Sequence, residues 1–301
     1  MNFQLHIGDW VNDGVDYLLD NYSGVFDAIG MVVDEFASTI EALLQVMPAE
    51  VMILLFALLG AWRLGLRFAI FTLAALGLIL LSGFWPQTVV TLGLTLSATM
   101  ISLLIGIPLG IWAATSDRVN MLIRPLLDFM QTMPAFVYLI PAAMLFGLGR
   151  VPGIIATVIF AMPPAVRLTT LGIRQVNKEI IEAGQSFGCT SSQLLFKVQL
   201  PNALPSIMAG VNQTIMMALS MVIIASMVGA GGLGNEVLAS IQRLDIGLGF
   251  ESGMSVVLLA IVLDRITESF GDSRRARRSG YLSRLFGRIS GQRAPVNGES
   301  H

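Results

Sequence analysis

The residues that most often carry catalysis or bind metal ions are scarce in this chain. His6 and His301 lie near opposite ends, and Cys189 is the only cysteine. A single cysteine excludes an internal disulfide and a cysteine-based metal site, and two distant histidines do not form a histidine-rich one. The sequence also lacks the G-x-x-x-x-G-K-S/T loop that binds nucleotide phosphates. These side chains therefore predict neither an enzyme nor a chain that binds ATP through such a loop.

A polar segment, 172–204, has the most informative spacing. It is much longer than a simple connection between two helices needs to be. Asn177 is a favourable N-cap for a helix over 177–187, and Gly188 suits the C-terminal cap of that helix. The segment is therefore predicted to contain a short helix rather than an irregular linker.

A second short helix is predicted over 193–198. Its candidate N-caps are Thr190, Ser191 and Ser192. Pro201 and Pro205 predict a break in the chain before the next apolar segment. Two short helices joined at a glycine form a compact, protruding knob, and small exposed residues allow the surface of a partner to approach it closely.

The elements that position this knob are predicted to cross a membrane. Hydrophobic residues make up 54% of the 301 positions and charged residues 13%, about half the charged share of a soluble domain. The mean hydropathy is +0.75. The predicted fold is an all-α integral membrane bundle of about seven transmembrane helices. The apolar segments are 48–62, 65–83, 88–115, 129–149, 152–171, 205–228 and 251–270.

Prolines and glycines mark irregular points along these segments. Kinks are expected at Pro108, Pro141, Pro163 and Pro164. Residues 229–234 fit the dinucleotide-binding pattern G-x-G-x-x-G, but they follow an apolar helix and not a strand. This context predicts a turn or helix break and argues against a cofactor site.

The basic residues predict the orientation of the chain. With the N-terminus outside, every Lys and Arg except Arg150 and Arg243 falls on the inner side. The arginine-rich tail 271–301 then lies in the cytoplasm, where it is interpreted as a topology anchor near anionic lipid. Nucleic-acid binding is the less favoured interpretation of the tail.

The N-terminal segment 1–47 is acidic and amphipathic. Apolar residues recur at helical spacing, carboxylates fill the other faces, and no Lys or Arg precedes Arg63. Because no basic region precedes an apolar core, the segment is not expected to be a cleavable signal peptide. One or two helices on the outer membrane surface or on the bundle are expected, with a disordered tail as the alternative.

The knob resembles the EAA signature of the permease subunits of ABC importers. The residues that match at the same spacing are Glu182, Ala183, Gly184, Gly188, Val198, Leu200 and Pro201. Gly184 stands where the signature has Ala, and Val198 where it has Ile. The resemblance implies that this loop couples the membrane helices to a separate ATPase, with Glu182 in contact with the ATPase and Gly188 at the turn.

The resemblance extends to the type I importer permeases, and motifs at 106–110, 131–134 and 229–234 resemble their glycine betaine, proline betaine and choline branch. The organisation it implies is an external segment 1–47, two peripheral transmembrane helices in 48–85, a five-helix core in 86–270 with the coupling loop 172–204, and a basic cytoplasmic tail 271–301.

The implied partners are two ATPase subunits that carry ATP and Mg²⁺, an external substrate-binding protein, a second permease copy in a homodimer, and the lipid of a bacterial inner membrane. No cofactor on this chain and no nucleic-acid partner are expected.

Aromatic side chains are the natural contacts of a quaternary ammonium solute, through cation–π attraction. The candidate residues along the solute path are Phe129, Phe136, Tyr138, Asn212, Gln213 and Met217. Core packing is the alternative role of the aromatic residues, and interhelical hydrogen bonding is the alternative role of the two amides.

Three other functions are weaker predictions. An importer of methionine, taurine or phosphonate would share the knob and the glycine-rich motif. A channel or secondary carrier would need ionisable residues at membrane depth, whereas those of this chain fall near inner ends: Asp128, Arg167, Asp264, Arg265 and Glu268. An intramembrane enzyme would need paired catalytic groups.

Overall fold

The computed structural model describes residues 7–271, apart from the side chains of Ile7 and Val11; within this range the chain is helical and contains no strand. His6, His301 and the predicted tail anchor in 272–301 lie outside the described residues. The all-α prediction is confirmed.

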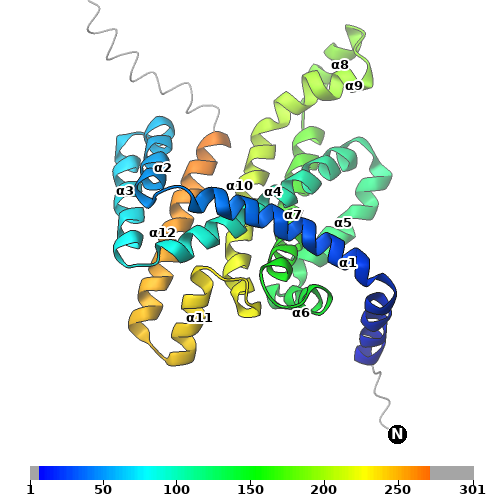
Figure 1. Cartoon of the computed structure of the whole chain (residues 1–301). Helices are drawn as coiled ribbons and strands as arrows, with labels where there is room; N and C mark the ends of the chain where they lie inside the picture. The colour runs from blue at the N-terminus through cyan, green and yellow to red at the C-terminus, as the bar shows by residue number, and fades with distance from the viewer. Residues whose placement is uncertain (1–6, 272–301) are drawn as a thin grey trace, which may run out of the picture.

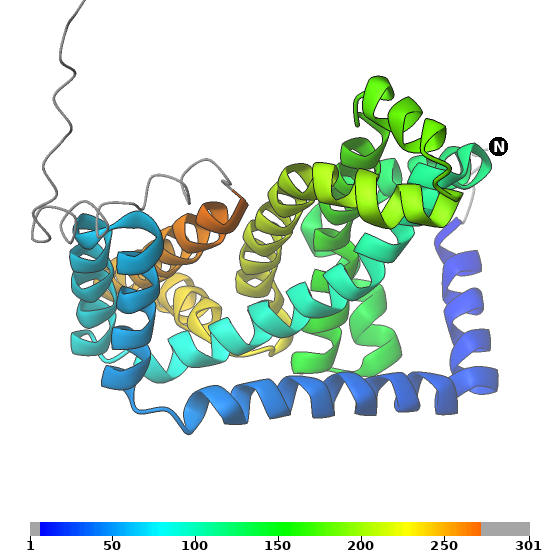
Figure 2. The same ribbon diagram turned by 90° about the horizontal axis from the view of Figure 1, so that it is seen from above.

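The N-terminal helix α1 (Ile7–Gln45) lies across the other helices (Figures 1 and 2). Its backbone leaves the helical conformation at Tyr22, which divides it into two parts, as the sequence allowed. Ala37 is buried, and the backbone of Glu41 passes close to helix α4 (Trp85–Thr115): a Cβ on Gly93 would lie 3.5 Å from the Glu41 Cα. The second part of α1 is therefore packed on the bundle.

Two short helices, α2 (Ala49–Leu64) and α3 (Leu66–Leu81), meet at Gly65 and pack on the last helix, α12 (Ile246–Gly271). The Arg63 guanidinium donates to the Ser269 carbonyl at 2.6 Å and lies 4.5 Å from the ring centre of Phe270. This polar contact ties the end of α2 to the end of α12.

The centre of the bundle consists of α4 (Trp85–Thr115), α7 (Arg150–Arg174) and α10 (Leu200–Ala225). Gly110 lets α4 approach α7 closely, because a Cβ there would lie 2.7 Å from the Thr169 Cβ. The Thr170 hydroxyl donates to the Gly110 carbonyl at 3.0 Å. Helices in lipid associate through small residues and hydroxyl hydrogen bonds of this kind. Hydrophobicity alone does not favour a neighbouring helix over a lipid acyl chain.

The predicted span 129–149 is wrong as a single helix. The chain forms α5 (Asp117–Thr132) and α6 (Ala135–Phe146), which are bent by 101° at a short break. Pro134 at the break has no N–H to donate, and Met133 before it is extended, the conformation that a following proline favours. Asp117 pairs with Arg174 at 2.8 Å and holds the start of α5 against α7.

The predicted break before the sixth apolar segment is also wrong. Helix α9 (Ser191–Leu194) passes through a π turn, η1 (Leu195–Gln199), directly into α10. Pro201 lies in the first turn of α10, where its missing N–H costs least, and Pro205 is accommodated inside the helix. In the widened turn, the Leu200 N–H donates to the Leu195 carbonyl, five residues back.

The predicted turn at 229–234 is confirmed. A short 3₁₀ segment, η2 (Ser226–Val228), ends α10, and Gly229 adopts a left-handed conformation before α11 (Leu233–Arg243). The helices α4, α6 and α7 continue through the other prolines, Pro108, Pro141, Pro163 and Pro164.

Within residues 7–271, four helices are long and apolar enough to cross a membrane: α4, α7, the continuous helix Ser191–Val228 and α12. Counting each bent pair, α1 with α2 and α5 with α6, as one span brings the number to six, and α3 is a shorter apolar helix. The predicted number of seven is therefore approximate.

Candidate functional site

The knob consists of α8 (Lys178–Ser186), α9 and η1, and it projects beyond the ends of the other helices (Figures 1 and 2). The Asn177 side chain accepts a hydrogen bond from the Glu179 N–H at 3.0 Å, so the predicted N-cap is confirmed. Thr190 caps α9, and its hydroxyl and the Gln193 side chain bond reciprocally to each other's backbone N–H groups.

Gly188 ends α8, as predicted, in a left-handed conformation with φ +78°. The Cys189 N–H donates to the Gly184 carbonyl at 3.1 Å, and the Gly188 N–H donates to the Gln185 carbonyl at 2.9 Å. This pair of bonds is a Schellman motif, which satisfies carbonyls that the end of a helix leaves unpaired. Local backbone bonding thus fixes the turn between the two short helices.

Glu182 and Ala183 are exposed on α8, whereas Gly184 faces η1. A Cβ on Gly184 would lie 2.8 Å from the Leu194 Cδ1 and 3.8 Å from the Val198 Cγ2. The structure therefore brings Gly184 and Val198, the two positions that depart from the signature, into one packing contact. Because Gly184 has no Cβ, α8 can lie close to α9 and η1.

Two of the predicted coupling residues belong to α10. Leu200 packs against a buried cluster formed by Ile173, Ala203 and Ile207, and Pro201 is exposed next to it. Because η1 leads into α10 without a break, a displacement of the knob acts on a transmembrane helix directly.

Sequence reasoning missed two exposed aromatic residues on the knob. Phe187 is 90% exposed at the end of α8, and Phe196 is 61% exposed in η1. Apolar side chains in a short amphipathic helix are ordinarily taken for its buried face. Only the projection of the knob away from the bundle shows that nothing within residues 7–271 covers them.

Tyr138 closes the break between α5 and α6. Its hydroxyl donates to the Met130 carbonyl at 2.5 Å, and both residues are buried. The end of a helix leaves its last carbonyls unpaired, which is costly away from water. Tyr138 therefore stabilises the bend, and its predicted contact with solute stays a prediction.

A second polar contact joins α10 to α12. The Asn212 amide donates to the Asp264 carboxylate at 3.1 Å and accepts a bond from the Thr267 hydroxyl. Asn212 thus forms the interhelical hydrogen bonds that were the alternative to a place in the solute path.

The other predicted path residues have different surroundings. Phe129 and Phe136 are exposed on either side of the α5–α6 break, Gln213 is exposed on α10, and Met217 is half-buried there.

A family described as the inner membrane component of binding-protein-dependent transport systems matches residues 106–275. The chain belongs to this family. It is 52% identical over 272 residues to the glycine betaine/proline betaine transport system permease protein ProW of Escherichia coli, covering 90% of this chain and 77% of that protein.

A second relative is the glycine betaine transport system permease protein OpuAB of Bacillus subtilis, 45% identical with 91% of this chain and 97% of the relative covered. Among solved structures, the chain is similar to that of an inward-facing MetNI methionine ABC transporter. The TM-score is 0.54 at 21% identity, covering 63% of this chain and 93% of the other. That likeness confirms the predicted type I permease fold and carries no information on the solute.

Proposed function

We propose that this permease is the membrane-spanning subunit of an ATP-driven importer of glycine betaine, proline betaine or a related quaternary ammonium solute such as choline. The observation that carries the coupling role is the knob itself. It projects from the bundle, has a fixed turn at Gly188, continues into α10 and exposes Phe187. Exposed aromatic residues of this kind become buried when a partner docks.

The solute class is supported by the relatives. Permeases whose names state glycine betaine, proline betaine or carnitine are 45–52% identical to this chain over about nine-tenths of its length. A methionine importer is the alternative, and the fold shared with the methionine transporter at 21% identity does not favour it.

The proposed assembly has two copies of this chain, two ATPase subunits beneath them that bind ATP and Mg²⁺, and an external binding protein. The knob lies in the cytoplasm and α1 lies outside, as the distribution of Lys and Arg favours. ATP binding closes the ATPases, moves the knob around Glu182 and reorients α10.

The test combines a charge reversal and a bulky side chain in the knob. Glu182→Lys combined with Gly188→Leu is expected to abolish co-purification of the ATPase and ATP-dependent glycine betaine uptake by membrane vesicles. Glu50→Lys, a charge reversal in the first turn of α2, is the matched control. This variant is expected to retain both co-purification of the ATPase and uptake. Normal uptake by the knob variant would refute the coupling role, and uptake of methionine without uptake of betaine would refute the solute class.

A further inference from the structure

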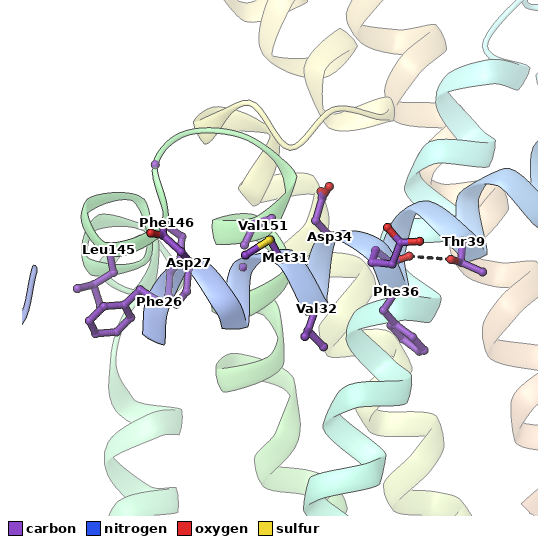
Figure 3. A pocket seen from close by; sticks show the side chains of 13 residues that line it. Phe26, Asp27, Met31, Val32, Asp34, Phe36, Thr39, Leu145, Phe146 and Val151 are labelled. Carbon is purple, nitrogen blue, oxygen red and sulfur yellow. Dashed lines mark hydrogen bonds between the residues drawn. The ribbon is translucent and has the colours of Figure 1, made fainter. Parts of the chain in front are cut away.

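A groove of about 1130 Å³ runs between α1 and residues 145–151 (Figure 3). We call this the outer groove, and the residues that line it include Phe26, Asp27, Met31, Val32, Glu35 and Phe146. In Figure 2, the second part of α1, which follows Tyr22 and contains the residues of the groove, runs along the side of the bundle opposite to the knob. The groove is therefore far from the proposed ATPase.

The walls of the outer groove are held in place. The Arg150 guanidinium bonds to both oxygens of Asp34, at 2.5 and 3.1 Å, and lies 3.4 Å from the Glu41 carboxylate. The rings of Phe26 and Phe146 meet edge to face with their centres 5.6 Å apart. These contacts connect α1 to the end of α6 and the start of α7, so the groove is formed before any partner arrives.

The exposed surface along this groove is apolar and negative. Val32 is 70% exposed and Met31 68%. The side chains of Asp27 and Glu35 are also exposed, and neither takes part in an ion pair within the described range 7–271. No Lys or Arg precedes Arg63 in the sequence, so α1 itself carries no basic residue to balance these carboxylates.

The charge decides what can cover such a surface. A membrane with anionic lipids attracts basic segments and disfavours a row of carboxylates. A two-fold contact with a second copy would place this surface against itself, which brings like charges together. The occupant that remains is a different protein with basic residues around an apolar contact, because opposite charges steer association and exclude wrong partners.

We propose that the outer groove is a docking surface for a basic face of the external solute-binding protein. The family to which the chain belongs is described as binding-protein-dependent, so a protein of this class has to meet the permease. The inference rests on the proposed function, and in particular on the orientation that places α1 outside. Asp27 and Glu35 steer the encounter, and Met31 and Val32 lose exposed apolar surface in the complex.

The first experiment measures association of the binding protein with the whole importer, permease and ATPase together, in lipid nanodiscs. Asp27→Lys with Glu35→Lys is expected to lower the association rate constant about tenfold at low salt and to flatten its salt dependence, because the change falls on steering charges. Glu251→Lys, an exposed charge reversal on α12, is the matched control with an unchanged rate. Equal rates for wild type and the double variant, or an equal loss in the control, would overturn the proposal.

The second experiment separates the three occupants. Because Cys189 is the only cysteine, Cys189→Ser with Val32→Cys gives one site for an environment-sensitive dye. The binding protein is expected to shift the dye's emission and shield it from an aqueous quencher. Quenching by spin-labelled lipid before the binding protein is added would identify the membrane as the occupant. A disulfide between two copies of this variant would identify the second permease, and either result would overturn the proposal.

Failure of this inference is distinguishable from failure of the proposed function. If only the docking surface is wrong, the binding protein still associates with wild type and the double variant at one rate, and uptake persists. If the importer assignment is wrong, no variant binds the protein and no ATP-dependent uptake occurs. Co-purification of the ATPase with the double variant shows that it is folded.

Discussion

Replacing Tyr138 by Phe removes a single oxygen atom from the break between α5 and α6. The ring remains, so its packing 6.2 Å from the ring of Phe160 is retained. What is lost is the donor to the Met130 carbonyl at the end of α5. The change therefore isolates the contribution of one hydrogen bond to the bend.

The magnitude follows from burial. Tyr138 is 7% exposed and Met130 6%, so water cannot readily replace the hydroxyl. A buried acceptor that loses its partner costs about 1–3 kcal/mol. For a chain of this size, a loss of that order lowers the midpoint of thermal unfolding by roughly 2–10 °C. The bend is expected to loosen first, because the break has few other polar contacts.

The assay is thermal unfolding of the purified permease in one detergent at one scan rate. Tyr22→Phe is the matched control, since Tyr22 is half exposed and its midpoint is expected to change by less than about 1 °C. A Tyr138→Phe midpoint equal to that of the control would refute the assignment of the hydroxyl to the bend. Uptake of solute at permissive temperature is expected to survive, because Phe keeps the aromatic ring.

Three further predictions concern single positions. Arg150→Gln removes the charge that holds two carboxylates of α1, so faster amide exchange is expected in the second part of α1, with a stability loss of about 1 kcal/mol since the pair is partly exposed; unchanged exchange would contradict it. Gly188→Ala strains a left-handed residue by about 1–2 kcal/mol and is expected to raise proteolysis of the knob. Gly188→Asn is expected to raise proteolysis less, because Asn tolerates this conformation better. Equal proteolysis of wild type and both variants would count against the Schellman turn. Gly232→Ala places a Cβ 2.4 Å from the Thr91 hydroxyl oxygen, so a severe loss of folded protein on size-exclusion chromatography is expected. The control is Gly253→Ala, whose Cβ meets no atom within 4 Å and which is expected to be tolerated. Equal yields of the two variants would argue against the tight turn.

The caps of the knob could be predicted because they depend on neighbouring backbone groups. Asn177 and Gly188 bond within a few residues of themselves, and such bonds are the same in any tertiary context. Hydrophobicity likewise predicted apolar helices, because lipid requires every backbone group to be paired within the helix. The predicted bounds of α3, α4 and α7 agree with the structure within a few residues for the same reason, whereas α11 was not predicted.

The two errors in the path of the chain have a common physical cause. The hydrophobicity summed over 129–149 does not depend on the direction of the helix axis, so it could not predict the 101° bend. Pro201 and Pro205 predict a helix break, yet a first-turn position and a π turn accommodate the missing N–H at Pro201. In both cases the path of the chain depended on whether neighbouring groups could bond to the backbone at the proline.

The amino-acid sequence is sufficient to predict a helical membrane protein with a capped knob, because those features arise from local bonding and from the solvent that each segment requires. Which polar side chains bond to one another depends on the tertiary structure. The partners of Asn212 lie 52 and 55 residues away, and the carboxylates bound by Arg150 lie 109 and 116 residues away. Such pairs form when packing brings distant helices together. Within residues 7–271, the exposed ring of Phe187 on the knob and the Glu35 carboxylate, which forms no ion pair there, mark the surfaces where we expect other proteins to bind.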